Sequence, residues 1–187
     1  MSTIRSISKN IVYLASGELV SKILQFVLMV YAARLLDQAS FGKFSFALSL
    51  SFIAIIIADL GINQLLIREI ARNKEDVNKY FINAFIVKLA FAFVTWLFII
   101  LLLNSLGYPK DTRYVVYAIW FFTVISTFTD LFYSIFRAFE SMFYDSLIKI
   151  LRMAILTVLG LYVLFKGYGV LAFSATFILV EAIMVIV

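Results

Sequence analysis

The chain has 187 residues, of which 64% are hydrophobic and only 14% are charged. Soluble domains carry about 25% charged residues and use them to cover their surface, so the composition excludes a soluble globular protein. The formal net charge is +5, which in so apolar a chain indicates cytoplasmic loops rather than a nucleic-acid partner. The absence of cysteine and histidine excludes disulfides, thiolate or imidazole metal sites and Ser-His-Asp triads.

The sequence predicts an all-α integral membrane protein built as one six-helix bundle over residues 1–187. A membrane-spanning helix needs about 20 mostly apolar residues. The last apolar stretch ends without a flanking cation or cap, and we therefore expect the chain to be truncated at its C-terminus. In chain order the predicted spans cover residues 11–36, 44–66, 81–103, 114–136, 147–165 and 169–187.

The distribution of Lys and Arg predicts the orientation of the chain. With a cytoplasmic N-terminus, the inner segments carry nine of these residues and the outer loops carry five, while Lys22 and Lys88 lie inside spans. Cytoplasmic loops are enriched in Lys and Arg, so the bias favours a multi-pass protein of the cell membrane with both termini in the cytoplasm.

The first span carries a polar face. Glu18, Ser21, Lys22 and Gln25 follow the spacing i, i+3, i+4, i+7, which places them on one side of a helix. If the apolar core begins near Ile11, Lys22 lies about 16 Å deep, too far for easy snorkelling. Two interpretations remain open: a Glu18–Lys22 ion pair that pins two helices together, or a polar face that lines a water-filled cavity.

The fourth span repeats this pattern, with Thr123, Ser126, Asp130, Ser134 and Arg137 on one face. Arg137 lies at the predicted cytoplasmic end, where it is either a positive-inside anchor or a contact at the mouth of a cavity. Asp130 lies about 10 Å deeper and is a candidate to line that cavity.

Ionisable residues also occur in the third and sixth spans. Lys88 either snorkels toward the cytoplasmic edge or faces the cavity. Glu181 falls near mid-depth on the same face as Ser174. The fifth span is apolar beyond Arg152, and we assign it to packing or lipid contact.

The second span shows a stripe of small residues, which is typical of close helix packing. Asp59 ends its apolar core, and it is expected to cap the helix or to pair with Arg68 or Arg72.

Several expected motifs of membrane enzymes and pumps are missing. There is no Gly-rich phosphate loop, no Asp cluster for Mg²⁺ and no Gly-rich selectivity filter. We therefore expect neither an enzyme nor a selective ion channel, and no cofactor or metal. Several spans with inward polar faces instead favour one lobe of a transporter.

Short segments of the chain resemble the N-terminal part of a known family. Together they resemble the polysaccharide-biosynthesis flippases of the MATE-like (multidrug/oligosaccharidyl-lipid/polysaccharide) exporter superfamily. The segments are NIVYLASGE at 10–18, ARLL at 33–36, FGKFSFA at 41–47, DLGIN at 59–63, REIAR at 68–72 and FRAFESMFY at 136–144.

The resemblance implies a fold of two six-helix lobes that enclose a cavity and rock between inward-open and outward-open states. It also implies a cargo, an oligosaccharide on a polyprenyl phosphate or pyrophosphate, which passes from the cytoplasmic to the outer leaflet. At 187 residues the chain holds one lobe, so the second lobe is either further sequence or a second copy.

A lipid pyrophosphate is anionic, so buried cations would attract it. The expected cavity residues are Glu18, Lys22, Gln25, Lys88 and Asp130, with Arg34 and Arg137 at the mouth. Glu18 and Asp130 would hold the lysines or take up coupling protons or cations. The alternatives are a cation-coupled multidrug exporter of the same fold and a membrane scaffold subunit that transports nothing.

Overall fold

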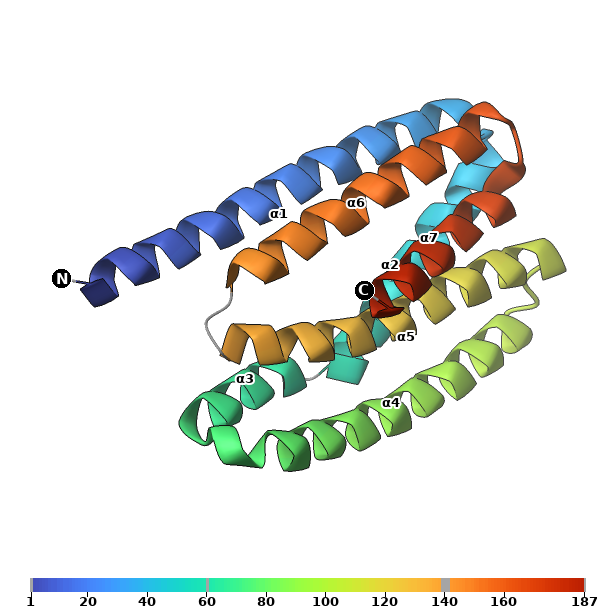
Figure 1. Cartoon of the computed structure of the whole chain (residues 1–187). Coiled ribbons are helices and arrows are strands. Elements are labelled where there is room, and N and C mark those ends of the chain that lie inside the picture. The colour runs from blue at the N-terminus through green and yellow to red at the C-terminus, as the bar shows by residue number, and fades with distance from the viewer. Residues whose placement is uncertain (1, 60, 139–141, 187) are drawn as a thin grey trace.

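The computed structural model describes residues 2–59, 61–138 and 142–186, and the side chains at 2–11, 57, 58, 142 and 186 lie outside that description. Over the described residues the fold is entirely helical (Figure 1). The elements are α1 (Ser2–Leu35), α2 (Gln38–Asp59), α3 (Ile62–Arg72), η1 (Lys74–Asp76), α4 (Val77–Ser105), α5 (Lys110–Ala138), α6 (Met142–Phe165) and α7 (Gly169–Ile186).

Within the described residues, five helices are long and apolar enough to cross a membrane. The chain is therefore a multi-pass membrane protein, as its composition predicts. The sixth predicted span corresponds to a shorter apolar helix, Gly169–Val185. The five candidate spans are Val12–Leu35, Gln38–Ile56, Lys74–Ser105, Lys110–Ala138 and Phe143–Phe165.

The predicted second span, residues 44–66, is divided between α2 and α3. Gly61 adopts a left-handed backbone conformation with φ of 81°, which glycine accepts at little cost because it has no side chain. This turn separates α2 from α3. The other end of α2 begins earlier than expected because Asp37 caps it, with a carboxylate oxygen 3.0 Å from the amide nitrogen of Ser40. Hydrogen bonds from the Ser40 side chain and amide lower the pKa of Asp37.

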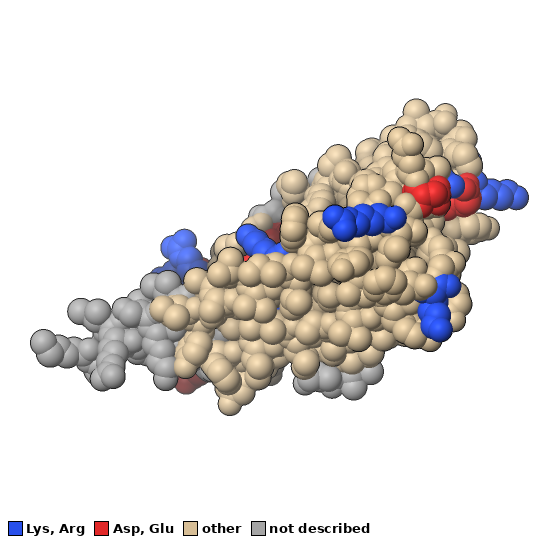
Figure 2. Space-filling model, turned by 90° about the horizontal axis from the view of Figure 1, so that it is seen from above, with Lys and Arg blue, Asp and Glu red and all other residues tan. Residues whose placement is uncertain are grey.

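Helix α5 lies at the centre of the bundle. It packs against α2, α3, α4 and α7, whereas α1 packs along α6 and makes few contacts with α2 (Figure 1). An ion pair between Lys43 and Asp111 ties α2 to α5 near the start of each helix. Large apolar side chains cover much of the exterior, and charged side chains are sparse over the face in Figure 2. Such an exterior suits contact with lipid rather than water.

The close approach of α1 to α6 depends on two glycines. A Cβ atom on Gly17 would lie 2.9 Å from the Cβ and 3.1 Å from the Cα of Ser146. A Cβ on Gly160 would lie 2.8 Å from a methyl carbon of Leu28. Because packed helices cannot absorb extra atoms without moving, these glycines set the spacing of the pair.

Gly17→Ala is expected to lower the free energy of unfolding by about 1–3 kcal/mol, because the added methyl group meets the backbone of α6. The measurement is the thermal unfolding midpoint of the purified protein in detergent. Gly42→Ala is the matched control, since a Cβ at Gly42 meets nothing within 4 Å. Equal midpoints for the two variants would contradict this account of the α1–α6 contact.

Candidate functional site

A cleft lined by both polar and apolar side chains opens between α1 and α2. It has a volume of about 300 Å³, and its floor is formed by α5, α6 and α7. The cleft exists because α1 follows α6 rather than α2, which leaves the two consecutive helices apart. Its polar lining residues are Glu18, Ser21, Lys22, Gln25, Ser126, Lys149, Arg152 and Glu181.

The polar face predicted for the first span lines this cleft. All four of its members, Glu18, Ser21, Lys22 and Gln25, belong to the lining. Lys22 and Gln25 are exposed in the cleft. Among the side chains that the structure describes, none lies within hydrogen-bond or ion-pair distance of the Lys22 ammonium. The cleft therefore holds a cation that is free to meet an anion.

Glu18 pairs with Lys149 on α6 rather than with Lys22 as its spacing permits. The distance from the Lys149 Nζ to the Glu18 Oε1 is 3.4 Å. Lys149 also lies 3.4 Å from Asp145, one helical turn away. The ion pair thus joins α1 to α6. The Glu18 carboxylate has Lys149 as its partner and does not need Lys22.

The floor of the cleft contains a second ion pair. The Arg152 Nη1 lies 3.2 Å from one carboxylate oxygen of Glu181 and 3.4 Å from the other, and also 3.4 Å from the Ser126 hydroxyl. Glu181 is only 1% exposed. The Arg152 guanidinium compensates the buried charge of Glu181, because an unpaired carboxylate inside the bundle would raise the free energy of the folded state.

The assignment of the fifth span to packing or lipid contact missed a polar face. Asp145, Lys149 and Arg152 follow the spacing i, i+4, i+7, which was a usable signal. The residues that line the cleft include three cations, Lys22, Lys149 and Arg152, and two carboxylates, Glu18 and Glu181. Among the lining residues cations therefore outnumber carboxylates by one, while Lys149 also contacts the buried Asp145 behind the cleft.

Arg137 lies outside the cleft and binds Asp145. Its guanidinium forms a two-pronged contact, with Nη2 at 3.0 Å and Nε at 3.2 Å from the two carboxylate oxygens. Asp145 is fully buried. The contact joins the end of α5 to the start of α6, so Arg137 has a structural partner. Arg34 is exposed in the last turn of α1 and is not part of the cleft lining.

Lys88 also lies outside the cleft, and so does Asp130 on α5. The Lys88 ammonium is 2.8 Å from an Asp59 oxygen and 3.1 Å from the backbone carbonyl of Thr127. Asp59 therefore pairs with Lys88 rather than with Arg68 or Arg72, and the pair ties α2, α4 and α5 together.

The structure brings three of the five expected cavity residues into one cleft: Glu18, Lys22 and Gln25.

The lining offers hydrogen bonds and positive charge rather than a metal centre. Over the described residues, no three His, Cys, Asp or Glu side chains come together in a group that could hold a metal ion. Ser21, Gln25 and Ser126 supply neutral donors and acceptors beside the unpaired Lys22. This combination fits a ligand that carries both hydroxyl groups and an anion.

A family model described as "Polysaccharide biosynthesis protein" matches residues 7–187. The chain belongs to the polysaccharide biosynthesis protein family. Membership confirms the resemblance that the short sequence segments carry, and it gives the chain a role in the biosynthesis of polysaccharides. Comparison with curated proteins and comparison with solved structures find no significant match.

Proposed function

We propose that the chain is one lobe of a flippase that moves a polyprenyl-linked oligosaccharide from the cytoplasmic to the outer leaflet. The observation that carries the proposal is the unpaired Lys22 in a partly polar cleft, within a membrane bundle of the polysaccharide biosynthesis family. The bundle binds and moves its cargo without changing it chemically, so it is not an enzyme.

The chemistry of the cargo matches the chemistry of the cleft. A glycan cannot enter hydrocarbon without losing its hydrogen bonds to water, and a hydrated polar surface replaces them. Ser21, Gln25 and Ser126 supply such bonds. The phosphate or pyrophosphate of the carrier lipid is anionic, and Lys22 is the cation we assign to it.

A second lobe is needed to close the cleft. Glu18, Lys22 and Gln25 are exposed, so the cleft between α1 and α2 has an open side. We propose that a second six-helix lobe, from further sequence or from a second copy, faces this side. Rocking of the two lobes would expose the cleft to each leaflet in turn. Both termini would lie in the cytoplasm of a cell-membrane protein.

Lys22→Gln is expected to reduce glycan export by tenfold or more in cells that lack the native gene, because a hydrogen bond to a charged group contributes about 1.5–3 kcal/mol. Lys22→Arg is expected to retain most of the export. The measurement is the amount of polysaccharide at the cell surface, at matched levels of membrane protein. Lys166→Gln is the control, since Lys166 is exposed and lies outside the cleft.

The same experiment separates the alternatives. Full export by Lys22→Gln would contradict the proposed role of Lys22 and favour a scaffold subunit. Unchanged export accompanied by loss of resistance to cationic drugs would favour a cation-coupled multidrug exporter, although three cations against two carboxylates in the cleft oppose a cationic cargo.

A further inference from the structure

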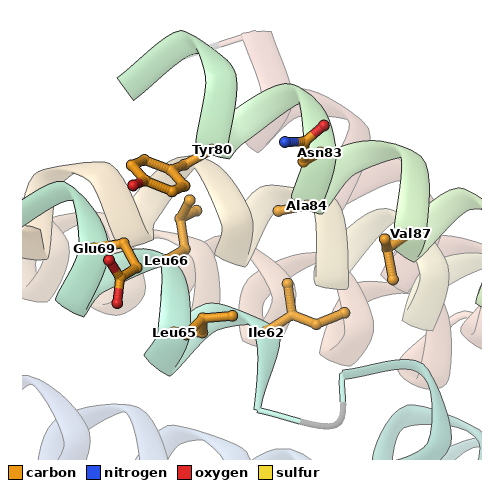
Figure 3. A pocket seen from close by; sticks show the side chains of 8 residues that line it. All are labelled: Ile62, Leu65, Leu66, Glu69, Tyr80, Asn83, Ala84 and Val87. Atoms are coloured by element: carbon orange, nitrogen blue, oxygen red, sulfur yellow. The ribbon is translucent and has the colours of Figure 1, made fainter. Parts of the chain in front are cut away.

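The groove between α3 and α4, shown in Figure 3, gives a ligand little to bind beyond apolar surface. Most of its lining is apolar, and the carboxylate that lines it, Glu69, already lies 4.0 Å from the Arg72 guanidinium. The cleft between α1 and α2 is different. In its floor the Arg152 guanidinium faces the open space with only part of its hydrogen-bond donors in use.

Arg152 meets its partners through a single nitrogen atom. Its Nη1 lies 3.2 and 3.4 Å from the two Glu181 oxygens and 3.4 Å from the Ser126 hydroxyl. Arg137, by contrast, meets Asp145 with two nitrogens, Nη2 and Nε. A guanidinium carries N–H donors on all three of its nitrogens. Among the described residues, the donors on Nη2 and Nε of Arg152 have no acceptor and are left for a ligand.

The two partners in this ion pair differ in their access to the cleft. The Arg152 side chain is 27% exposed, whereas Glu181 is 1% exposed. An anion in the cleft can therefore reach the guanidinium and compete with Glu181 for it. A buried carboxylate that loses its arginine is costly as a charge and much less costly as a neutral acid. Binding of an anion to Arg152 therefore favours uptake of a proton by Glu181.

Two titratable groups of α5 act on Glu181 in addition to Arg152. The Asp130 carboxylate and the Tyr133 phenol both lie close enough to Glu181 to interact with it electrostatically. Asp130 repels a second negative charge beside it. The Tyr133 hydroxyl is buried, and it has no hydrogen-bond partner in the part of the chain that the structure describes. These surroundings favour the neutral acid once Arg152 turns to another anion.

The other charges around this cluster belong to ion pairs of their own. Helix α2 also contacts α7, and both of its charged residues are paired. Arg152 is thus the cation near Glu181 that can exchange one anion for another. The pairs are Lys43 with Asp111, Lys88 with Asp59, Arg137 with Asp145, and Lys149 with both Asp145 and Glu18.

The composition makes such an exchange visible as a dependence on pH. Histidine is the side chain that ordinarily titrates between about pH 5 and 8, and the sequence contains none. Anion binding that changes across this range therefore reports a carboxylate in unusual surroundings, and Glu181 is the one that shares Arg152 with the cleft.

We propose that Glu181 and the cargo anion compete for Arg152, so that the cleft binds the phosphate of a lipid-linked glycan tightly only when Glu181 carries a proton. This regulation rests on the function proposed for the cleft, and it makes Arg152 a second contact for the anion beside Lys22. Because linked equilibria are reciprocal, anion binding and protonation of Glu181 favour each other to the same extent. A proton is taken up from water as the anion binds and returns to water as the anion leaves.

The test is calorimetric titration of the full protein, in nanodiscs of phosphatidylcholine, with citronellyl phosphoryl glucose. This probe is a short prenyl phosphodiester of a sugar, and it lacks the ionisation near pH 6 of a phosphate monoester, so its own charge stays constant. The unmodified protein is expected to bind it about tenfold more tightly at about pH 5.5 than at about pH 8. The binding enthalpy is expected to depend on the buffer, which reports proton uptake.

Glu181→Gln is expected to bind the probe with the high affinity at both pH values and without proton uptake, because the amide leaves Arg152 free for the anion. Glu18→Gln is the matched control, since it neutralises the other carboxylate that lines the cleft, and it is expected to keep the pH dependence. Lys22→Gln is expected to weaken binding at both pH values and also to keep the pH dependence.

Three results would overturn the proposal: binding by the unmodified protein that does not change with pH, a pH dependence that persists in Glu181→Gln, and loss of binding by a folded Glu181→Gln. Binding that ignores pH but is weakened by Lys22→Gln would reject the competition and retain the proposed function. Absence of binding at both pH values would reject both. If Glu181→Gln fails to fold, proton uptake by the unmodified protein and by Glu18→Gln still decides whether the two events are coupled.

Discussion

Lys88→Met is expected to lower the free energy of unfolding by about 1–3 kcal/mol, since it removes the ion-pair partner of Asp59, which is 26% exposed, and the hydrogen bond to the Thr127 carbonyl. Lys88 is 1% exposed, and its ammonium contacts both Asp59 and the backbone carbonyl of Thr127. The single substitution therefore removes a junction between α2, α4 and α5. The measurement is the fraction of folded protein that elutes as a single species in detergent, followed over a temperature ramp.

The double variant Asp59→Asn/Lys88→Met is the control. Without Lys88 the carboxylate at Asp59 is the destabilising group, so its neutralisation is expected to recover much of the lost stability. The sequence alone also allowed Lys88 to bind the cargo. A Lys88→Met protein that keeps its thermal stability but fails to export glycan would support that role and contradict the structural one.

Arg152→Met is expected to have a larger effect, about 3–5 kcal/mol, because Glu181 is almost completely buried and the Arg152 guanidinium is its ion-pair partner among the described residues. The substitution keeps a long apolar side chain in the floor of the cleft, so the loss reports on charge rather than on packing. The measurement is the same temperature ramp, with the packing of α6 against α7 expected to loosen first.

Glu181→Gln provides the matched comparison. The neutral amide leaves Arg152 beside the open cleft, where water reaches it, and the expected loss of stability is smaller than for Arg152→Met. Equal losses for the two variants would contradict the view that the buried carboxylate is the costly group.

The local sequence was sufficient to predict the five membrane-length helices and the polar face of α1, but not the division of residues 44–66 between α2 and α3. Apolar runs of membrane length are visible without any knowledge of contacts, and the spacing of Glu18, Ser21, Lys22 and Gln25 fixes their common face whatever surrounds the helix. The break at Gly61 was only partly predicted, because the sequence ended the apolar core at Asp59 but the span was continued to residue 66, and the positive φ of Gly61 places the turn.

The partners of the charged residues were not predictable in the same way. Lys149 reaches Glu18 across 131 positions of sequence, and Lys88 reaches Asp59 across 29. Helical periodicity reports which residues share a face, but it says nothing about which helix that face meets. The pairing of α1 with α6 decides the partner of Glu18, and this pairing depends on the close approach at Gly17.

The proposed function requires the cleft to be a water-filled surface within the membrane, and the reaction of an introduced thiol tests this requirement. The sequence contains no cysteine, so Gln25→Cys can be labelled without removal of native thiols. Thiols react as thiolates, which form in water and not in hydrocarbon. Val158→Cys is the control, because Val158 is 67% exposed on α6 but lies outside the cleft.

A charged, membrane-impermeant thiol reagent, applied to both sides of native membranes, is expected to label Gln25→Cys and to leave Val158→Cys unlabelled. Added lipid-linked oligosaccharide is expected to slow the labelling of Gln25→Cys. Failure of the reagent to label Gln25→Cys, in a protein shown to be folded and inserted, would contradict the claim that this cleft is a hydrated pathway.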